Sequence, residues 1–308
     1  MVHYLSKALI LTAAVAAAFW CCHLDAQSTF SESFETPYNH ITVEKIGRTV
    51  EMSSRWRSAV YRESAVSLSD PTFLLVPYTR LVFSGVVFRP SPGAALMIGL
   101  GGGAINDAFC AAFPKAVLTT VELDPKVVDL AKEFMAFRSS DRNQIAVDDG
   151  RIFLKHTKAS YDWIILDAFR GGYVPPHLKT VEFYRQIGQR LTPNGIMIAN
   201  LHTGTKLFEC DLRTISEAFS QLAVFKVKET DNAIAVAANF REPSFAAMLN
   251  ASKEDGIPGP LRRNLKIGDI KSALTPLSPE RLRLGTLLTD DFAPTEFYDV
   301  VKSQNGAE

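Results

Sequence analysis

The sequence predicts an α/β protein in which a mostly parallel sheet is covered by helices on both faces. Between residues 93 and 240, apolar runs of strand length alternate with segments of helical spacing, which indicates parallel strands joined by crossover helices. Residues 37–70 instead alternate apolar and polar side chains around Gly47, which indicates a small β-rich unit built on a hairpin. Hydrophobic residues make up 47% of the 308 residues and charged residues 21%, a composition that excludes a disordered chain or a polytopic membrane protein.

Seven strands are expected in the larger unit, at residues 94–100, 117–123, 145–147, 161–166, 196–201, 224–227 and 233–238. Helices are expected between them, at residues 106–113, 125–137, 180–191 and 207–222, and a turn is expected at 192–195. A further helix is expected at 77–88, with proline in its first turn. Five strand–helix units followed by two adjacent strands are the plan of a class I methyltransferase-type Rossmann sheet.

The chain divides into five expected segments. Residues 1–26 are a signal peptide or membrane anchor, 27–36 a polar linker, and 37–92 the N-terminal β-hairpin unit with a connecting helix. Residues 93–240 form the Rossmann-like domain, and 241–308 form an irregular C-terminal tail with a helical stretch near 245–252. Lys plus Arg and Asp plus Glu both number 33, so the balanced charge gives no reason to expect a nucleic-acid partner.

The N-terminal segment has the pattern of a targeting sequence. Lys7 precedes 13 residues, Ala8 to Trp20, that are apolar apart from Thr12. A helix that crosses a bilayer needs about 20 apolar residues, so this run suits the core of a signal peptide better. We therefore expect export to the periplasm or membrane attachment through the N-terminus, with a cytoplasmic location as the alternative.

A glycine-rich turn follows the first strand of the larger unit, where the sequence reads MIGLGGGA over residues 97–104. Glycines let the backbone approach a nucleotide closely, and the N-terminus of the following helix presents free N–H groups to it. We expect Gly99, Gly101 and Gly103 to bind an adenosyl ligand. The alternatives are a tight turn without a ligand and a dinucleotide site, because the spacing also fits the G-x-G-x-x-A pattern.

Acidic residues end the next three strands. Glu122 is placed to accept hydrogen bonds from the ribose hydroxyls of an adenosine, and Asp149 from the exocyclic amine of adenine. Asp167 would lie over the reactive end of the ligand, where a carboxylate can hold an ammonium substrate and accept its proton. The alternatives are a solvated strand end for Glu122, a turn at Gly150 for Asp149, and a brace for the next loop for Asp167.

These residues resemble the spermidine synthase (polyamine aminopropyltransferase) family. The resemblance covers residues 37–239, about two thirds of the chain, and is carried by the segments YNHITV (38–43), GGG (101–103), VELD (121–124), DG (149–150) and YDWIILD (161–167). It implies an N-terminal β-unit packed on a Rossmann domain that binds decarboxylated S-adenosylmethionine and an amine, with Tyr78 lining the substrate pocket. The family moves an aminopropyl group to the amine and releases methylthioadenosine.

The chain also departs from the family's pattern. Ala104 stands where the family has an acid after the three glycines, Arg170 stands where it has a second acid after Asp167, and Thr79-Arg80 replaces His-Glu after the tyrosine. A second ammonium would then lack its carboxylate, and Arg170 would repel it at short range if its side chain turns inward. We therefore expect weak or absent turnover of putrescine, unless Arg170 points to solvent and Asp290 or Asp291 supplies the missing charge.

The function expected from the sequence is therefore aminopropyl transfer from decarboxylated S-adenosylmethionine to a small amine in polyamine biosynthesis. The alternatives are a methyltransferase that uses intact S-adenosylmethionine and a non-catalytic protein that binds an adenosyl ligand. The donor would be a co-substrate, with no permanently bound cofactor. No Cys or His spacing typical of a metal site occurs, so none is expected. A homodimer is a further expectation.

Overall fold

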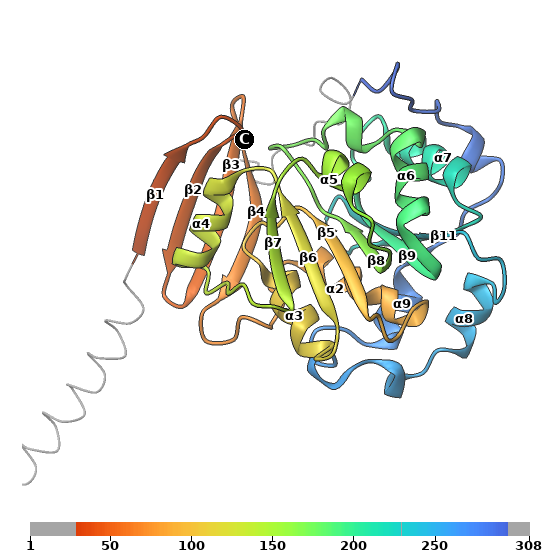
Figure 1. Ribbon diagram of the computed structural model, residues 1–308, viewed down its shortest axis with the longest axis horizontal. Coiled ribbons are helices and arrows are strands. Elements are labelled where there is room, and N and C mark those ends of the chain that lie inside the picture. Colours follow the sequence, from red (N-terminus) through yellow and green to blue (C-terminus); the bar gives the residue numbers. More distant parts are fainter. Residues whose placement is uncertain (1–28, 229, 295–308) are drawn as a thin grey trace, which may run out of the picture.

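A computed structural model describes residues 29–228 and 230–294 of the chain (Figure 1). The expected leader at residues 1–26 lies outside the described residues. Within the described part, the chain forms a small antiparallel sheet and a larger mostly parallel sheet with helices on both faces. No helix among the described residues has the length and apolar character needed to cross a membrane.

The smaller sheet contains four antiparallel strands in chain order: β1 (Thr29–Glu35), β2 (His40–Ile46), β3 (Thr49–Trp56) and β4 (Ala59–Ser67). The expectation of a linker at 27–36 is therefore wrong, because most of this segment is β1. Its polar composition suits an edge strand that is exposed along most of its length. Phe30 and Phe34 still place their rings 5.3 and 6.4 Å from the ring of Phe134, so the strand packs on the larger domain.

The larger sheet has the strand order β12-β10-β11-β9-β8-β5-β6-β7. Strands β5 to β9 run parallel, and β11 lies antiparallel between β9 and β10, which confirms the expected methyltransferase-type sheet. All seven expected strands are present. Their bounds are β5 (Ala94–Ile98), β6 (Val117–Glu122), β7 (Asn143–Val147), β8 (Tyr161–Leu166), β9 (Leu191–His202), β10 (Gln221–Lys226) and β11 (Asn232–Ala238), and β12 (Leu274–Thr275) adds an eighth at the edge.

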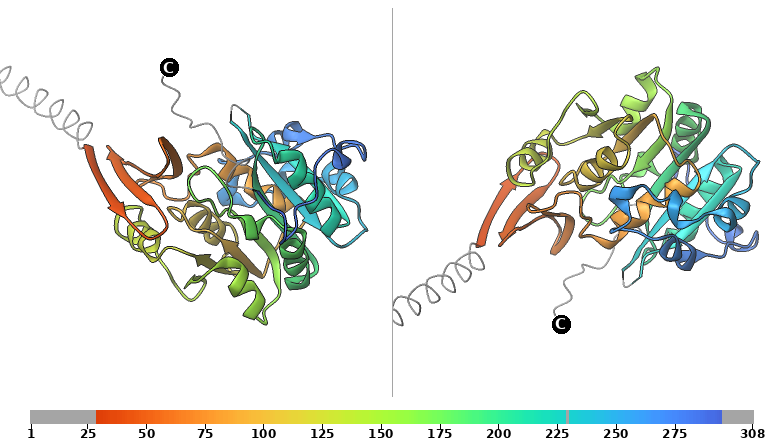
Figure 2. Two further views of the ribbon diagram at one scale, coloured as in Figure 1. Left: turned by 90° about the horizontal axis from the view of Figure 1, so that it is seen from above. Right: turned by 90° about the horizontal axis from the view of Figure 1, so that it is seen from below.

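Helices α5, α6 and α7 cover one face of this sheet, and α2 and α3 cover the other (Figures 1 and 2). The helices are α2 (Pro77–Val82), α3 (Ala104–Ala112), α4 (Pro125–Phe134), α5 (Gly150–His156), α6 (Val181–Arg190), α7 (Phe208–Ala218), α8 (Phe245–Ala251) and α9 (Ile267–Ala273). The expected helix at 77–88 continues beyond α2 only as a 3₁₀ helix, η1 (Phe83–Val87). Helix α5 was not expected, and the expected turn at 192–195 is instead the start of β9.

The expected irregular tail is a packed part of the domain as far as the structure describes it. Helix α8 confirms the helical stretch near 245–252, and apolar side chains from this region are buried in the core, among them Phe245, Ile257, Leu261 and Ile270. Strand β12 pairs with β10 and so closes that edge of the sheet. The name "tail" is wrong for this segment, because its apolar residues complete the face of the sheet covered by α2 and α3.

Candidate active site

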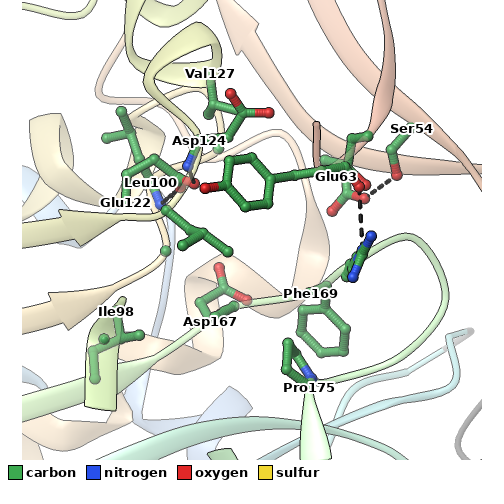
Figure 3. Close-up of a pocket in the computed structure, with 18 of the residues that line it drawn as sticks. Ser54, Glu63, Ile98, Leu100, Glu122, Asp124, Val127, Asp167, Phe169 and Pro175 are labelled. Carbon is green, nitrogen blue, oxygen red and sulfur yellow. Dashed lines mark hydrogen bonds between the residues drawn. The ribbon is translucent and has the colours of Figure 1, made fainter. Parts of the chain in front are cut away.

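A cavity of about 380 Å³ lies where the carboxyl ends of the parallel strands meet the smaller sheet (Figure 3). Its volume suits a small organic ligand, and its position is where α/β sheets bind ligands. Five of the six residues expected in the donor or catalytic site line it, and so does Tyr78. The lining from both sheets includes Glu63, Tyr78, Gly99, Gly101, Glu122, Asp149, Asp167, Phe169, Arg170 and His177.

The glycine-rich turn forms one wall of the cavity. Gly99 has φ of 98°, and a Cβ atom there would lie 2.1 Å from the carbonyl oxygen of Asp167, so a side chain cannot be accommodated. Gly103 is an exception among the expected ligand-binding glycines, because it does not line the cavity. It precedes α3 with φ of 80°, and a Cβ atom there would meet the ring of Phe137 at 2.4 Å. The role of Gly103 is therefore to allow this turn.

Glu122 lies at the end of β6 with its carboxylate at the glycine-rich turn (Figure 3). One oxygen accepts a hydrogen bond from the backbone N–H of Leu100 and the other from that of Asp124, both at 2.9 Å. Burial raises the pKa of Glu122, and the two backbone N–H groups oppose this shift. Each carboxylate oxygen has two lone pairs, so both can still accept a hydrogen bond from a ligand hydroxyl.

Asp149 lies at the cavity and also begins α5. Its Oδ1 accepts hydrogen bonds from the backbone N–H groups of Arg151 and Ile152, which is the geometry of an N-cap. Its Oδ2 lies 2.8 Å from Nε2 of His177, and this contact lowers the pKa of Asp149. The alternative of a turn-forming role is thus present in the structure, and the adenine contact expected for Asp149 would have to share an oxygen with the cap or with His177.

Asp167 follows β8 and is held from two sides. Its Oδ2 accepts a hydrogen bond from the Tyr78 hydroxyl of α2 at 2.9 Å, and its Oδ1 accepts one from the Asn200 amide of β9 at 3.0 Å. Asn232 of β11 donates to Asn200 in turn, at 3.0 Å. Burial raises the pKa of Asp167 although both donors oppose the shift, and burial also raises the pKa of Tyr78 well above its ordinary value. A fixed carboxylate with a raised pKa is suited to accept a proton.

Arg170 lies on the cavity wall but turns toward the smaller sheet. Its Nε donates to the carbonyl oxygen of Tyr38 at 3.2 Å, and its guanidinium carbon lies 5.8 Å from the ring centre of Trp56. The side chain is therefore not paired with Asp167. Asp290 and Asp291 do not line the cavity either. Both carboxylate oxygens of Asp290 accept hydrogen bonds from Arg151 at 2.7 Å. The expectation that Asp290 or Asp291 supplies the missing charge is therefore wrong.

Two residues of the site were missed by the sequence analysis. Asn200 carried a weak signal, since it is a polar residue near the end of an apolar strand, where the other site residues also occur. Glu63 carried no such signal, because it belongs to β4 of the smaller sheet and not to a strand end of the larger one (Figure 3). Burial raises its pKa to about 8, and the carboxylates of Asp167 and Glu122 add to the shift.

Comparisons with known proteins agree with this arrangement. Residues 80–210 match the family model described as spermine/spermidine synthase domain. A polyamine aminopropyltransferase from Vibrio vulnificus is 30% identical over 223 residues, which cover 71% of this chain and 74% of the relative.

Two solved structures share the fold. A spermidine synthase in complex with the transition-state analogue AdoDATO has a TM-score of 0.65 at 16% identity, with 82% of this chain and 88% of that chain covered. The human methyltransferase-like protein 13, in complex with SAH, has a TM-score of 0.54 at 24% identity, with 61% and 92% covered. The fold is therefore shared with both kinds of transferase. The family model and the Vibrio vulnificus relative, which covers most of the chain, both indicate the aminopropyltransferase family. On that basis the chain belongs to the polyamine aminopropyltransferase family of transferases.

Proposed function

We propose that this protein transfers an aminopropyl group from decarboxylated S-adenosylmethionine to an amine. The observation that carries the proposal is the place of Asp167, which Tyr78 and Asn200 hold in the same cavity as Glu122 and the glycine-rich turn. A proton acceptor and the features suited to an adenosyl ligand would thus share one cavity. Relatives named polyamine aminopropyltransferase support the same reaction.

The donor would lie along the wall formed by the strand ends. Glu122 would accept hydrogen bonds from the ribose hydroxyls, and Asp149 would lie at the adenine. Gly99 and Gly101 line the cavity, so their backbone would border the sulfonium and its substituents. A positive sulfur is a good leaving group, so the protein's main contribution is to position the two reactants.

The reaction is then a direct displacement. The lone pair of the uncharged acceptor nitrogen attacks the aminopropyl carbon that is bonded to sulfur, a C–N bond forms as the C–S bond breaks, and methylthioadenosine leaves with the sulfur electron pair. Asp167 takes the proton that the nitrogen loses. The raised pKa of Asp167 favours this step, because a carboxylate with a higher pKa holds a proton better.

The test measures methylthioadenosine release from decarboxylated S-adenosylmethionine with putrescine as acceptor. Asp167→Asn keeps the size of the side chain but removes the base, so we expect the rate to fall by roughly 10²- to 10⁴-fold. Asp129→Asn, the same change at an exposed position of α4, is the matched control and should behave as wild type. Undiminished turnover in Asp167→Asn would exclude Asp167 as the base.

Methyl transfer from intact S-adenosylmethionine is the second candidate, and Ala104 is the observation that favours it. The first residue of α3 carries no acid, so the free N–H groups of this turn are compatible with the carboxylate that only the intact donor has. Methylation assays with S-adenosylmethionine, run beside the aminopropyl assay, separate the two. Binding of S-adenosylhomocysteine that is tighter than that of methylthioadenosine would favour methyl transfer.

A further inference from the structure

Glu63 reaches the cavity because of an irregularity in the smaller sheet. Along the β3–β4 pair, Met52 is opposite Ser64 and Ser53 is opposite Arg62, which leaves Glu63 without a partner residue. This is a β-bulge, a feature that redirects side chains and often lies beside active sites. Side chains of a regular strand alternate between its two faces, yet Glu63 and its neighbour Ser64 both line the cavity. The bulge therefore brings Glu63 into the site.

The carboxylate of Glu63 lies where two cavities meet. A second cavity of about 60 Å³ adjoins the first and shares Glu63, Tyr78 and Phe169 with it. The second cavity is lined mainly by polar residues beyond Tyr78, including Asn200, His202, Asp231 and Asn232. Ser54 of β3 donates a hydrogen bond to Glu63, which fixes the carboxylate at this junction (Figure 3).

The electrostatic surroundings of Glu63 favour a bound cation. Its pKa of about 8 reflects burial first and then the nearby carboxylates Asp167 and Glu122. Arg170 lies on the same wall, but it is directed toward Tyr38 and Trp56. The titratable or charged groups that line the two cavities around Glu63 include Tyr61, Arg62, Tyr78, Glu122, Asp167, Arg170, His202 and Asp231. An ammonium between these acids would offset their repulsion and replace the solvation they lack.

We propose that Glu63 binds the second ammonium group of a diamine acceptor. The inference rests on the proposed function, because it places the reacting amine at Asp167. The rest of the acceptor then extends past Tyr78 and Phe169 toward the smaller cavity, and its far ammonium meets the carboxylate of Glu63. A diamine is thereby preferred to a monoamine with the same carbon chain. This holds although Arg170 stands at the position where the family has a second acid.

The test is calorimetric binding of putrescine and of butylamine to the complex of the full chain with methylthioadenosine. Butylamine has the same four carbons but lacks the second ammonium. Wild type should bind putrescine more tightly than butylamine, and Glu63→Gln should weaken putrescine binding by roughly ten- to hundredfold, the usual effect of one hydrogen bond to a charged group. Butylamine and methylthioadenosine should bind Glu63→Gln as they bind wild type, which also shows that the variant is folded.

Proton release gives a second readout that a merely structural role would not change. In the ligand-free protein the carboxyl group of Glu63 is mainly protonated below pH 8. A nearby ammonium favours the ionised form, so binding of putrescine at pH 7 should release a proton. Calorimetry in two buffers of different ionisation enthalpy measures this proton release. In wild type the release on binding putrescine should exceed the release on binding butylamine, and in Glu63→Gln the two should be equal. Glu44→Gln, an exposed position of β2 in the same sheet, is the matched control and should retain the wild-type difference.

A Glu63→Gln variant that still prefers putrescine, or a wild type that binds both amines equally or neither, would overturn the assignment. Weaker methylthioadenosine binding in Glu63→Gln with unchanged putrescine binding would overturn it in favour of a donor contact. A wild type that binds putrescine through Glu63 but releases no methylthioadenosine from the decarboxylated donor would support the ammonium site and reject aminopropyl transfer.

Discussion

Individual acids of the site perform structural and ligand-facing tasks with the same atoms. Glu122 accepts hydrogen bonds from the backbone N–H groups of Leu100 and Asp124, and it also lines the cavity. Removing the side chain would therefore loosen the glycine-rich turn as well as any ligand contact. A test of its ligand role needs a small change in the protein together with a matched change in the ligand.

We expect Glu122→Gln to weaken methylthioadenosine binding by about 1.5–3 kcal/mol, the usual contribution of a hydrogen bond to a charged group. Wild type should also bind methylthioadenosine more tightly than its 2′-deoxy analogue, and Glu122→Gln should lose most of this discrimination. Calorimetry on both proteins with both ligands gives the coupling directly. Equal discrimination in wild type and variant would show that Glu122 does not contact the 2′-hydroxyl group.

At the scale of elements, α5 illustrates how a short helix positions part of the site. It begins directly after Asp149, whose Oδ1 accepts two backbone N–H groups of its first turn. The same carboxylate contacts His177, which lies within the 3₁₀ helix η2 (Pro176–Leu178). Asp149 thus connects the end of β7, the start of α5 and the segment around His177 that lines the cavity.

Asp149→Ala should lower the free energy of unfolding by about 1 kcal/mol at pH 7, because an N-cap acceptor is lost. Asp149→Ser keeps such an acceptor and should recover most of the difference. The folded-state pKa of Asp149 is lowered, so the stabilisation from its charge is present above its unfolded value of about 3.9 and is lost as the pH falls through the lower folded value. In urea denaturation, the gap between wild type and Asp149→Ala should therefore narrow below about pH 4. A gap that widens there would contradict this account.

At the scale of the whole molecule, the C-terminal segment closes over the helices beside the cavity. Leu288 is fully buried, its N–H donates to Thr214 of α7, and its carbonyl oxygen accepts from the N–H of Val181 at the start of α6. Asp290 then accepts from Arg151 of α5 and from Thr180. Three helices that are separate in sequence are held together by this one crossing.

Leu288→Ala should lower the free energy of unfolding by roughly 2–4 kcal/mol, because it leaves a cavity among buried contacts. Leu284→Ala is the matched control four residues earlier, where the leucine is 74% exposed, and it should change stability by less than about 0.5 kcal/mol. Chemical denaturation of both variants measures the difference. Similar losses in the two would mean that the crossing does not contribute to the stability of the folded chain.

The order of elements and most of one wall of the cavity followed from the sequence alone. The alternation of strands and helices implies parallel strands, which bring their carboxyl ends to one edge of the sheet. Residues at four strand ends therefore gather at that edge. Gly99, Glu122, Asp149 and Asp167 all line the cavity for this reason. The edge strand β1 could not be predicted, because it is mostly exposed and a polar edge strand has a composition similar to that of a polar linker.

The side of the cavity that contains Glu63 and Arg170 was decided only by the tertiary structure. Glu63 enters through a bulge in β4, and the pairing of β3 with β4 that creates the bulge leaves no local sequence pattern. Arg170 could face Asp167 or the smaller sheet on sequence grounds, and only the packing of the two sheets directs it to Tyr38 and Trp56. The sequence by itself determined which edge of the sheet carries the cavity, because that follows from strand direction. Which charges face the ligand depends on contacts between residues far apart in the chain, and these exist only once the two sheets are packed together.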